Sequence, residues 1–447
     1  MTGDAPYRRS YSGRALHFLK RPIVCALIIG LLIRLLLTPF SGNEDLGYWA
    51  GTVLSIEGNS GLYGLSVYYY SPVWGYLLSA LVPIANLFGI SIGEIHYELV
   101  SDTLLSSFPY ITVTTIGFNV LVKTVLILFD VLTGVVLYKF IRSRCGEKDA
   151  MTAFMIWFFC PLVIFMSSVQ VMFDVVSVLF TLLAFIFVVR GNYFLAGLCF
   201  STGCLTKAFP VVAAPIFVAF ILAKHRGNRK ETAAGIGKGC LGAVLATVAI
   251  LLPNITAGNL GDAFFFMSSR LDRTIGASEP STLFDFSVYL MPAVFVIAVL
   301  LAVKLYLSDK EDLDRKMLKY IMLGFALLFL IPPWPQYLIL LVPFMAYYAI
   351  AYDRRYLYLL VLLSAVSTGY AFCNVNFGIL YSIVEYTDYI SLADFINNYK
   401  IPTVELFRSM SGILVWIQAA IIWVIVLVPA IDRICLWRRE RCKRIST

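Results

Sequence analysis

The chain has 447 residues, of which 60% are hydrophobic and only 14% are charged. A soluble protein of this length would need a more polar surface, so the composition excludes a soluble globular protein. The net charge of +8 does not indicate a nucleic-acid partner, because the basic clusters at 224–230 and 438–444 adjoin apolar stretches, as cytoplasmic loops of membrane proteins do.

Apolar stretches long enough for a bilayer recur along the whole chain. A membrane-spanning helix needs roughly 20 such residues to cross a hydrocarbon layer of about 30 Å. We therefore predict an all-α polytopic membrane protein with about 12 crossings, together with helices that lie along its outer face. The predicted crossings are 22–39, 117–138, 150–166, 173–189, 193–206, 209–223, 239–252, 286–306, 317–331, 336–352, 357–373 and 411–430.

The positions of the cations predict the orientation of the chain. The two tails and alternate connections between these spans hold 28 of the 35 lysines and arginines, and cytoplasmic segments are enriched in such residues. This pattern predicts two cytoplasmic tails, 1–21 and 431–447, around one transmembrane domain at 22–430. The extracytoplasmic loops are then 40–116, 253–285 and 374–410.

The segment 71–90 is apolar enough to cross, yet one extra crossing would place most basic loops outside. Two interpretations keep the orientation. The segment lies in or dips into the outer face, or it crosses and 99–116 crosses back. The first is favoured, because Pro72, Pro83 and Asn86 interrupt the run.

Seven cations fall within predicted spans or outer loops, where charges are costly and indicate function by default. They are Arg34, Lys123, Lys207, Arg270, Arg273, Lys400 and Arg408. Lys123 has a structural alternative, since Asp130 lies seven residues later on the same helical face and could pair with it. No histidine or cysteine pair has the spacing of metal ligands. Residues 254–256, "NIT", form a glycosylation sequon on the predicted outer face.

The first outer loop combines acids and aromatic rings. Glu44 and Asp45 follow the first span, no lysine or arginine occurs from 40 to 117, and 63–76 reads "YGLSVYYYSPVWGY". An interfacial aromatic belt explains many of these rings, and sugar rings also stack on such side chains. Transfer of a sugar from a lipid phosphate needs one general base, and cations that stabilise the phosphate. Arg270 and Arg273 are three residues apart and would face one pocket if they are helical.

Several motifs together resemble the GT-C superfamily of integral membrane glycosyltransferases. An acid after the first span is followed by "GLYGLSVYYYSPVWGYLL" (61–78), "KTVLILFDVLTGVVLYKFI" (123–141), "CPLVIFMSSVQVMFD" (160–174) and "GCLTKAFPVVAAP" (203–215). "PPWPQYLILLVPF" (332–344) resembles a late motif of the dolichyl-phosphate-mannose-dependent enzyme that adds the first mannose to GPI anchors. The chain departs from the family pattern by lacking a D-x-D and a glycine before Gln170.

This resemblance implies an inverting hexosyltransferase that moves a sugar, by resemblance mannose, from a polyprenyl- or dolichyl-phosphate donor to an acceptor hydroxyl on the outer face. It implies Asp45 as the general base, with Glu44 as the alternative. The implied donor-phosphate ligands are Arg270, Arg273 and Lys207, and the implied substrate-binding residues are Tyr70, Trp74, Gln170, Asp174, Gln336 and Tyr337. It implies no cofactor and leaves a divalent cation open.

The expected partners are the lipid donor, a glycan, glycolipid or protein acceptor, and the bilayer of a prokaryotic cell membrane or the endoplasmic reticulum. A transporter or flippase of lipid-linked sugars is the alternative function, although no internal repeat and no matching pair of broken spans supports it. A non-catalytic membrane scaffold is a third interpretation, and it leaves the acidic loop and the outward cations unexplained.

Overall fold

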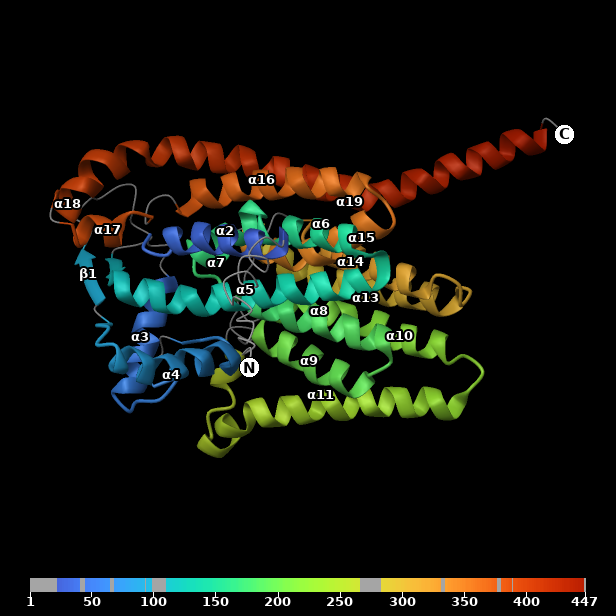
Figure 1. Cartoon of the computed structure of the whole chain (residues 1–447), viewed down its shortest axis with the longest axis horizontal. Coiled ribbons are helices and arrows are strands. Elements are labelled where there is room, and N and C mark those ends of the chain that lie inside the picture. The colour runs from blue at the N-terminus through green and yellow to red at the C-terminus, as the bar shows by residue number, and fades with distance from the viewer. Residues whose placement is uncertain are drawn as a thin grey trace, which may run out of the picture.

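The computed structural model describes residues 22–40, 45–64, 68–92, 94–98, 110–265, 283–330, 334–375, 379–387 and 389–445. The longer helices run side by side in a bundle, with short elements gathered at one end (Figure 1). The first half contains α2 (Pro22–Leu37), α3 (Asp45–Glu57), α4 (Pro72–Leu87), β1 (Glu94–Glu98), β2 (Tyr110–Thr114), α5 (Ile116–Cys145), α6 (Glu147–Phe158), α7 (Pro161–Ser168), α8 (Asp174–Arg190), α9 (Tyr193–Thr206), η1 (Phe209–Ala213) and α10 (Ala214–Lys224).

The second half contains α11 (Arg229–Ala257), η2 (Asp262–Phe264), α13 (Leu283–Leu307), α14 (Leu313–Leu328), η3 (Pro335–Leu340), α15 (Val342–Ala351), α16 (Arg355–Val375), α17 (Tyr381–Glu385), α18 (Leu392–Phe395), η4 (Ile396–Lys400), η5 (Ile401–Thr403) and α19 (Val404–Ile445). Each predicted span coincides with one or two of these helices, which supports the predicted helical membrane fold. In the described part, four helices are long and apolar enough to cross a membrane, or five if α6 and α7 form one bent span. The larger number of crossings stays a prediction.

The predicted span 150–166 is broken. Helices α6 and α7 meet at an angle of 48°. Pro161 is the first residue of α7, and Cys160 before it has an extended backbone with ψ of 116°. A proline disfavours helical geometry in the residue that precedes it, so the sequence itself explains the break.

A strand pair was not predicted. Strands β1 and β2 pair antiparallel, with Glu94 opposite Thr114 and Glu98 opposite Tyr110. The end of the segment 99–116 is therefore a strand, which contradicts the alternative in which that segment recrosses the membrane as a helix. Helix α4 covers most of 71–90, begins with Pro72 in its first turn and contains Pro83.

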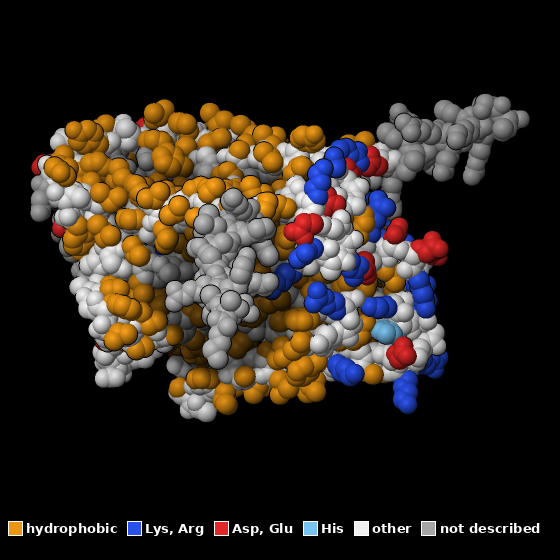
Figure 2. Space-filling model, viewed as in Figure 1, with side chains coloured by type: hydrophobic (Ala, Val, Ile, Leu, Met, Phe, Trp, Pro, Cys, Tyr) orange, Lys and Arg blue, Asp and Glu red, His pale blue; other side chains and the backbone are white. Residues whose placement is uncertain are grey.

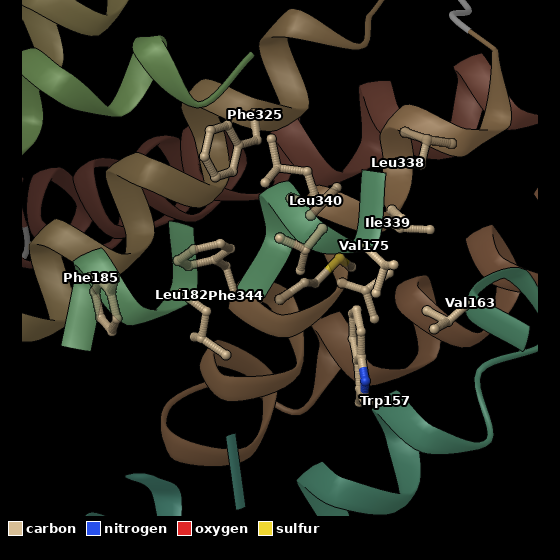
Figure 3. Packing of buried hydrophobic residues seen from close by; sticks show 14 of the residues in the cluster. Trp157, Val163, Val175, Leu182, Phe185, Phe325, Leu338, Ile339, Leu340 and Phe344 are labelled. Carbon is tan, nitrogen blue, oxygen red and sulfur yellow. The ribbon is translucent and has the colours of Figure 1, made fainter. Parts of the chain in front are cut away.

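The centre of the bundle is one large apolar core. Figure 3 shows part of it, with Trp157 of α6, Val175 and Phe185 of α8, and Phe344 of α15 among its buried side chains. The ring of Phe185 meets the ring of Phe344 edge-on at 5.7 Å between centroids. These helices hold the segments before α8 and α15 in place, and both segments contribute to the site described below.

A buried ion pair joins the first helices. Arg34 of α2 donates from Nε to Oδ2 of Asp130 in α5 at 2.7 Å, and both side chains are fully buried. Ser167 of α7 donates to the same oxygen at 3.1 Å. The indole of Trp157 donates to the Asp130 carbonyl at 2.9 Å. Asp130 therefore connects four helices.

The alternative pairing of Lys123 with Asp130 is wrong. Lys123 Nζ instead donates to the carbonyl oxygens of Thr38, at 3.0 Å, and Phe40, just beyond the end of α2. The last carbonyls of a helix lack backbone partners and carry partial negative charge, so a cation there is stabilising. Because Arg34 already pairs with Asp130, Lys123 can instead cap the C-terminal end of α2.

Basic side chains gather at one end of the bundle, and an apolar surface covers most of the rest of the visible face (Figure 2). At the basic end, Arg144 pairs with Asp314 at 2.7 Å between α5 and α14. Arg355 pairs with Asp353, and with Asp432 of α19 at 2.6 Å. This separation agrees with the predicted cytoplasmic connections, while the orientation of the termini stays a prediction.

The sequon at 254–256 lies in the last turn of α11 rather than in a loop. Asn254 is buried and helical. Its side chain accepts a hydrogen bond from Tyr76 at 3.1 Å and donates to Asn259 at 3.1 Å. Glycosylation requires an exposed asparagine, so this conformation argues against use of the sequon.

Candidate functional site

The candidate site lies at the end of the bundle opposite the basic connections. Asp174 is the first residue of α8, whose other end is Arg190 at the basic side. Lys207 directly follows α9 in an extended conformation, with φ of −145° and ψ of 134°. Helices α3 and α4 and the short helix η3 contribute the aromatic rings of Trp49, Trp74 and Tyr337 to the same site.

Three aromatic rings surround the ammonium group of Lys207. Lys207 Nζ lies 4.1 Å from the ring centroid of Phe173, 4.6 Å from that of Tyr70 and 5.6 Å from that of Tyr337. It also lies 3.5 Å from Oδ2 of Asp174. The side chain of Lys207 is 8% exposed. We call the three rings and Asp174 the Lys207 cage.

A second layer of aromatic rings supports the cage. The ring of Trp74 stacks on Phe173, with centroids 5.5 Å apart and planes inclined by 4°. Trp49 of α3 meets Phe173 edge-on at 5.5 Å. Phe209 lies against Tyr337 at 4.5 Å. Both tryptophans are buried, so they form the wall of the site rather than its surface.

The turn between α7 and α8 has an unusual backbone. Val171, between Gln170 and Asp174, has φ of +59° and is fully buried. A β-branched residue in the left-handed region is a genuine outlier, and such strain often marks functional sites. The turn is held by backbone hydrogen bonds from Gln170 to Phe165 and from Met172 to Met166, each 2.9 Å.

Buried polar atoms around the site include both donors and acceptors. The indole Nε1 atoms of Trp49 and Trp74 and the amide Oε1 of Gln170 are buried without a hydrogen-bond partner in the described part of the chain, whereas Asp174 Oδ2 faces Lys207 Nζ. Burial raises the pKa of the Tyr70 phenol well above its usual value, and the negative charge of Asp45 raises this pKa further. The site thus offers hydrogen-bonding groups of both kinds and aromatic faces, which suit the hydroxyl groups and the apolar faces of sugar rings.

The structure brings together Lys207, Asp174, Tyr70 and Tyr337 of the predicted site, with Trp74 as a supporting ring. Asp45 is the first residue of α3, and its charge acts on the Tyr70 phenol, while Gln170 lies in the strained turn. Gln336 is half-buried, and the contacts that define the cage do not include it. Glu44, Arg270 and Arg273 lie outside the described residues.

Sequence reasoning missed one ring of the site, Phe173, and gave Trp49 only as a possible wall for the acceptor beside Asp45. Phe173 directly precedes Asp174 within a stretch already recognised as a motif, and Trp49 lies four residues after Asp45. Each is one of many aromatic residues in a membrane protein, where such residues are common at the interfaces. Their position beside a motif was the available signal.

The described part of the chain contains no evident nucleophile and base pair. His225 contacts Tyr193 and Glu231, next to the basic connection. The cysteines of the described part form no disulfide, and the thiol of Cys160 lies 3.0 Å from the hydroxyl oxygen of Ser364. Among these residues no group of three or more His, Cys, Asp or Glu could hold a metal ion.

Comparison with known families matches residues 49–278 to the family described as "GPI transamidase subunit PIG-U". The matched range includes Tyr70, Trp74, Gln170, Asp174 and Lys207, whereas Asp45 lies outside it. No curated protein matches the chain.

The family match corrects the predicted activity. The GPI transamidase is a complex that attaches proteins and is not a mannosyltransferase, so the prediction of a hexosyltransferase using a dolichyl-phosphate donor is wrong. The resemblance to GT-C enzymes has a reason, because the PIG-U family is a membrane-protein family related to GT-C-like glycosyltransferases. The match spans more than half of the 447 residues, and the chain therefore belongs to the PIG-U family of GPI transamidase subunits.

Proposed function

We propose that this chain is a subunit of a GPI transamidase in the endoplasmic reticulum membrane and holds the glycolipid acceptor, while another subunit supplies the catalytic nucleophile. Membership of the PIG-U family supports the complex and the compartment. The lack of a nucleophile and base pair in the described residues agrees with a binding role. The functional assignment therefore depends on what the site can bind.

The Lys207 cage is the observation that carries this proposal. A charged lysine and a carboxylate are buried among stacked aromatic rings at the end of a membrane bundle. Ionisable side chains at membrane depth are expensive and indicate a functional site by default. Aromatic faces and buried hydrogen-bonding groups of both kinds fit a glycan, whose ring faces are apolar and whose hydroxyls donate and accept hydrogen bonds.

A transamidase replaces one amine on an acyl group by another amine, so the reaction needs an amine acceptor held near the acyl group. Fixing two reactants in the correct geometry can lower a barrier by about 7–11 kcal/mol, provided that the groups are well aligned. A subunit that binds the glycolipid at the membrane surface would contribute in this way without supplying a catalytic group.

Depletion of the chain from its own cells tests this function. We expect a GPI-anchored reporter to remain as its unprocessed precursor, and complete glycolipid with its full set of mannoses to accumulate. The physical reason is that loss of an acceptor-holding subunit blocks consumption of a finished acceptor. Mass spectrometry of the accumulated lipids is the measurement, and re-expression of the chain is the control.

The accumulated lipid decides the outcome. A truncated glycolipid that lacks a mannose would contradict the proposal, because it would mean that the chain acts before the acceptor is complete. Normal processing of the reporter in depleted cells would also contradict it.

A further inference from the structure

We infer that Tyr48 and Tyr69, together with the carboxylate of Asp45, form a subsite for an uncharged hexose ring of the glycolipid acceptor. The inference rests on the proposed function, since it identifies the part of the acceptor that this chain recognises. The subsite is distinct from the interior of the Lys207 cage, which is occupied by the ammonium group of Lys207 paired with Asp174. A ligand therefore has to use rings that are still exposed outside the cage.

The first argument is that these rings are both accessible and fixed. Tyr48 of α3 is 40% exposed, and Tyr69 is half-buried. The two rings meet edge-on with centroids 5.9 Å apart, and the ring of Tyr69 lies 4.6 Å from that of Tyr70. Tyr70 packs in turn against the buried ring of Phe173 at 5.0 Å. The cage thus anchors the exposed rings, and a ligand does not have to order them on binding.

The second argument is the position of Asp45. Asp45 and Tyr48 are three residues apart in α3, so their side chains lie on one face of the helix. The carboxylate is half-exposed, and its negative charge also acts on the Tyr70 phenol. A carboxylate accepts charge-assisted hydrogen bonds from hydroxyl groups. A flat apolar ring face beside a carboxylate therefore suits a sugar, whose C–H faces stack and whose hydroxyl groups donate.

The charges of this surface disfavour the phosphate of the glycolipid as the group bound here. The described cation beside Tyr70 is Lys207, which is 8% exposed and already paired with Asp174. This pairing also disfavours the donor-phosphate role that the sequence implied for Lys207. Asp45 is negative, and like charges repel each other more strongly where water is excluded. The ligand group that fits is therefore neutral and carries hydroxyl groups.

An interfacial aromatic belt is the alternative explanation for an exposed tyrosine at a membrane surface. A belt residue contacts lipid headgroups and needs no acid beside it. Leucine at position 48 would keep the contact with lipid and lose the flat ring face, so this substitution separates the two roles. Tyr389, between α17 and α18 at the same end of the bundle, is 92% exposed and serves as the matched control.

The test uses the purified transamidase complex containing the full chain, and a soluble trimannoside that carries a diazirine. The probe has no lipid, phosphate or amine, so the sugar alone directs it. Capture on peptides within 45–74 is measured by mass spectrometry, with and without excess unlabelled trimannoside. Mannitol is the matched competitor, because it has hydroxyl groups like those of mannose but no ring. The variants are Tyr48→Leu, Tyr48→Phe, Asp45→Asn and Tyr389→Leu.

We expect unlabelled trimannoside to remove most of the wild-type capture and mannitol to remove little of it. Tyr48→Leu should lower the competed capture about fivefold, whereas Tyr48→Phe should retain most of it because the ring face remains. Asp45→Asn should lower it about tenfold through loss of a charge-assisted hydrogen bond. Tyr389→Leu should behave as the wild type. Recovery of assembled complex for each variant shows that the protein has folded.

Unchanged capture by Tyr48→Leu would overturn the inference and assign this ring to the aromatic belt. Equal competition by mannitol, or no competed capture by the wild type, would also overturn it. These results leave the proposed function intact if depletion of the chain still causes complete glycolipid to accumulate. Accumulation of a truncated glycolipid would instead contradict the proposed function, and the inference with it.

Discussion

At the scale of single residues, Asp130 links the membrane helices to the candidate site. It accepts hydrogen bonds from Arg34 and Ser167, and Ser167 lies three residues before Gln170 in the strained turn. Two atoms of the ion pair, Arg34 Nη2 and Asp130 Oδ1, lack partners among the described residues. Removing one partner of a buried ion pair leaves an uncompensated charge and costs about 3–5 kcal/mol, whereas replacing both is often nearly neutral.

Stability measurements on Arg34→Met, Asp130→Leu and the double variant test this role. We expect each single variant to lower the free energy of unfolding by about 3–5 kcal/mol and the double variant to recover much of that loss. Thermal unfolding of the solubilised chain is the measurement. Strictly additive losses in the double variant would show that the two charges do not compensate each other.

The sequence predicted that Arg34 and Asp130 lie in membrane spans, but it did not predict that they pair with each other. Arg34 and Asp130 are 96 residues apart. Their pairing depends on how α2 packs against α5, which hydrophobic periodicity does not specify. The spacing of Lys123 and Asp130 on one helical face was a local signal, and the tertiary pairing overrode it. The Lys207 cage could not be predicted from local spacing either, because its rings come from segments that are distant along the chain.

At the scale of elements, hydropathy predicted the helices well, because each helix must bury its apolar surface in the protein or place it against lipid. The predicted span 193–206 coincides with α9, and the break before Pro161 follows from proline geometry. The strand pair was harder to predict, since its two short strands depend on each other for their backbone hydrogen bonds. The exact ends of α11 and α19 also extend beyond the predicted spans.

Close packing of α9 on α11 depends on glycine. The two helices lie side by side in Figure 1. A Cβ atom on Gly242 of α11 would lie 2.1 Å from the carbonyl oxygen of Phe194 in α9, whereas a Cβ on Gly237 of the same helix would meet nothing within 4 Å. Small residues at such interfaces let helix backbones approach closely in membranes.

Alanine substitutions in α11 test this contact. Gly242→Ala should lower the thermal stability of the solubilised chain, because the backbones must separate. Gly237→Ala should leave it unchanged or raise it slightly, since alanine favours a helix over glycine by about 1 kcal/mol. The comparison is made by thermal unfolding of both variants. Equal behaviour of the two would contradict the close approach of α9 and α11.

At the scale of the whole molecule, the basic residues and the candidate site are separated along the bundle axis. The basic connections and their ion pairs lie at one end, and the Lys207 cage lies at the other (Figures 1 and 2). This is the arrangement expected if the basic end is cytoplasmic and the cage faces the lumen.

The sequence motifs led to the correct relatives and to the wrong activity. They recovered Lys207, Asp174, Tyr70 and Tyr337, which the structure brings together. A fold and a set of positions can persist while the chemistry changes, so motifs shared with glycosyltransferases do not establish sugar transfer.

The central claim is that this end of the bundle binds the glycolipid acceptor. A photo-crosslinking amino acid placed at Tyr70 in the assembled complex should capture the endogenous glycolipid, which mass spectrometry would identify. The same amino acid at Tyr352, which packs among tyrosines near the basic end, should not capture it. Capture at residue 352 but not at residue 70, in a complex that still processes its reporter, would contradict the account.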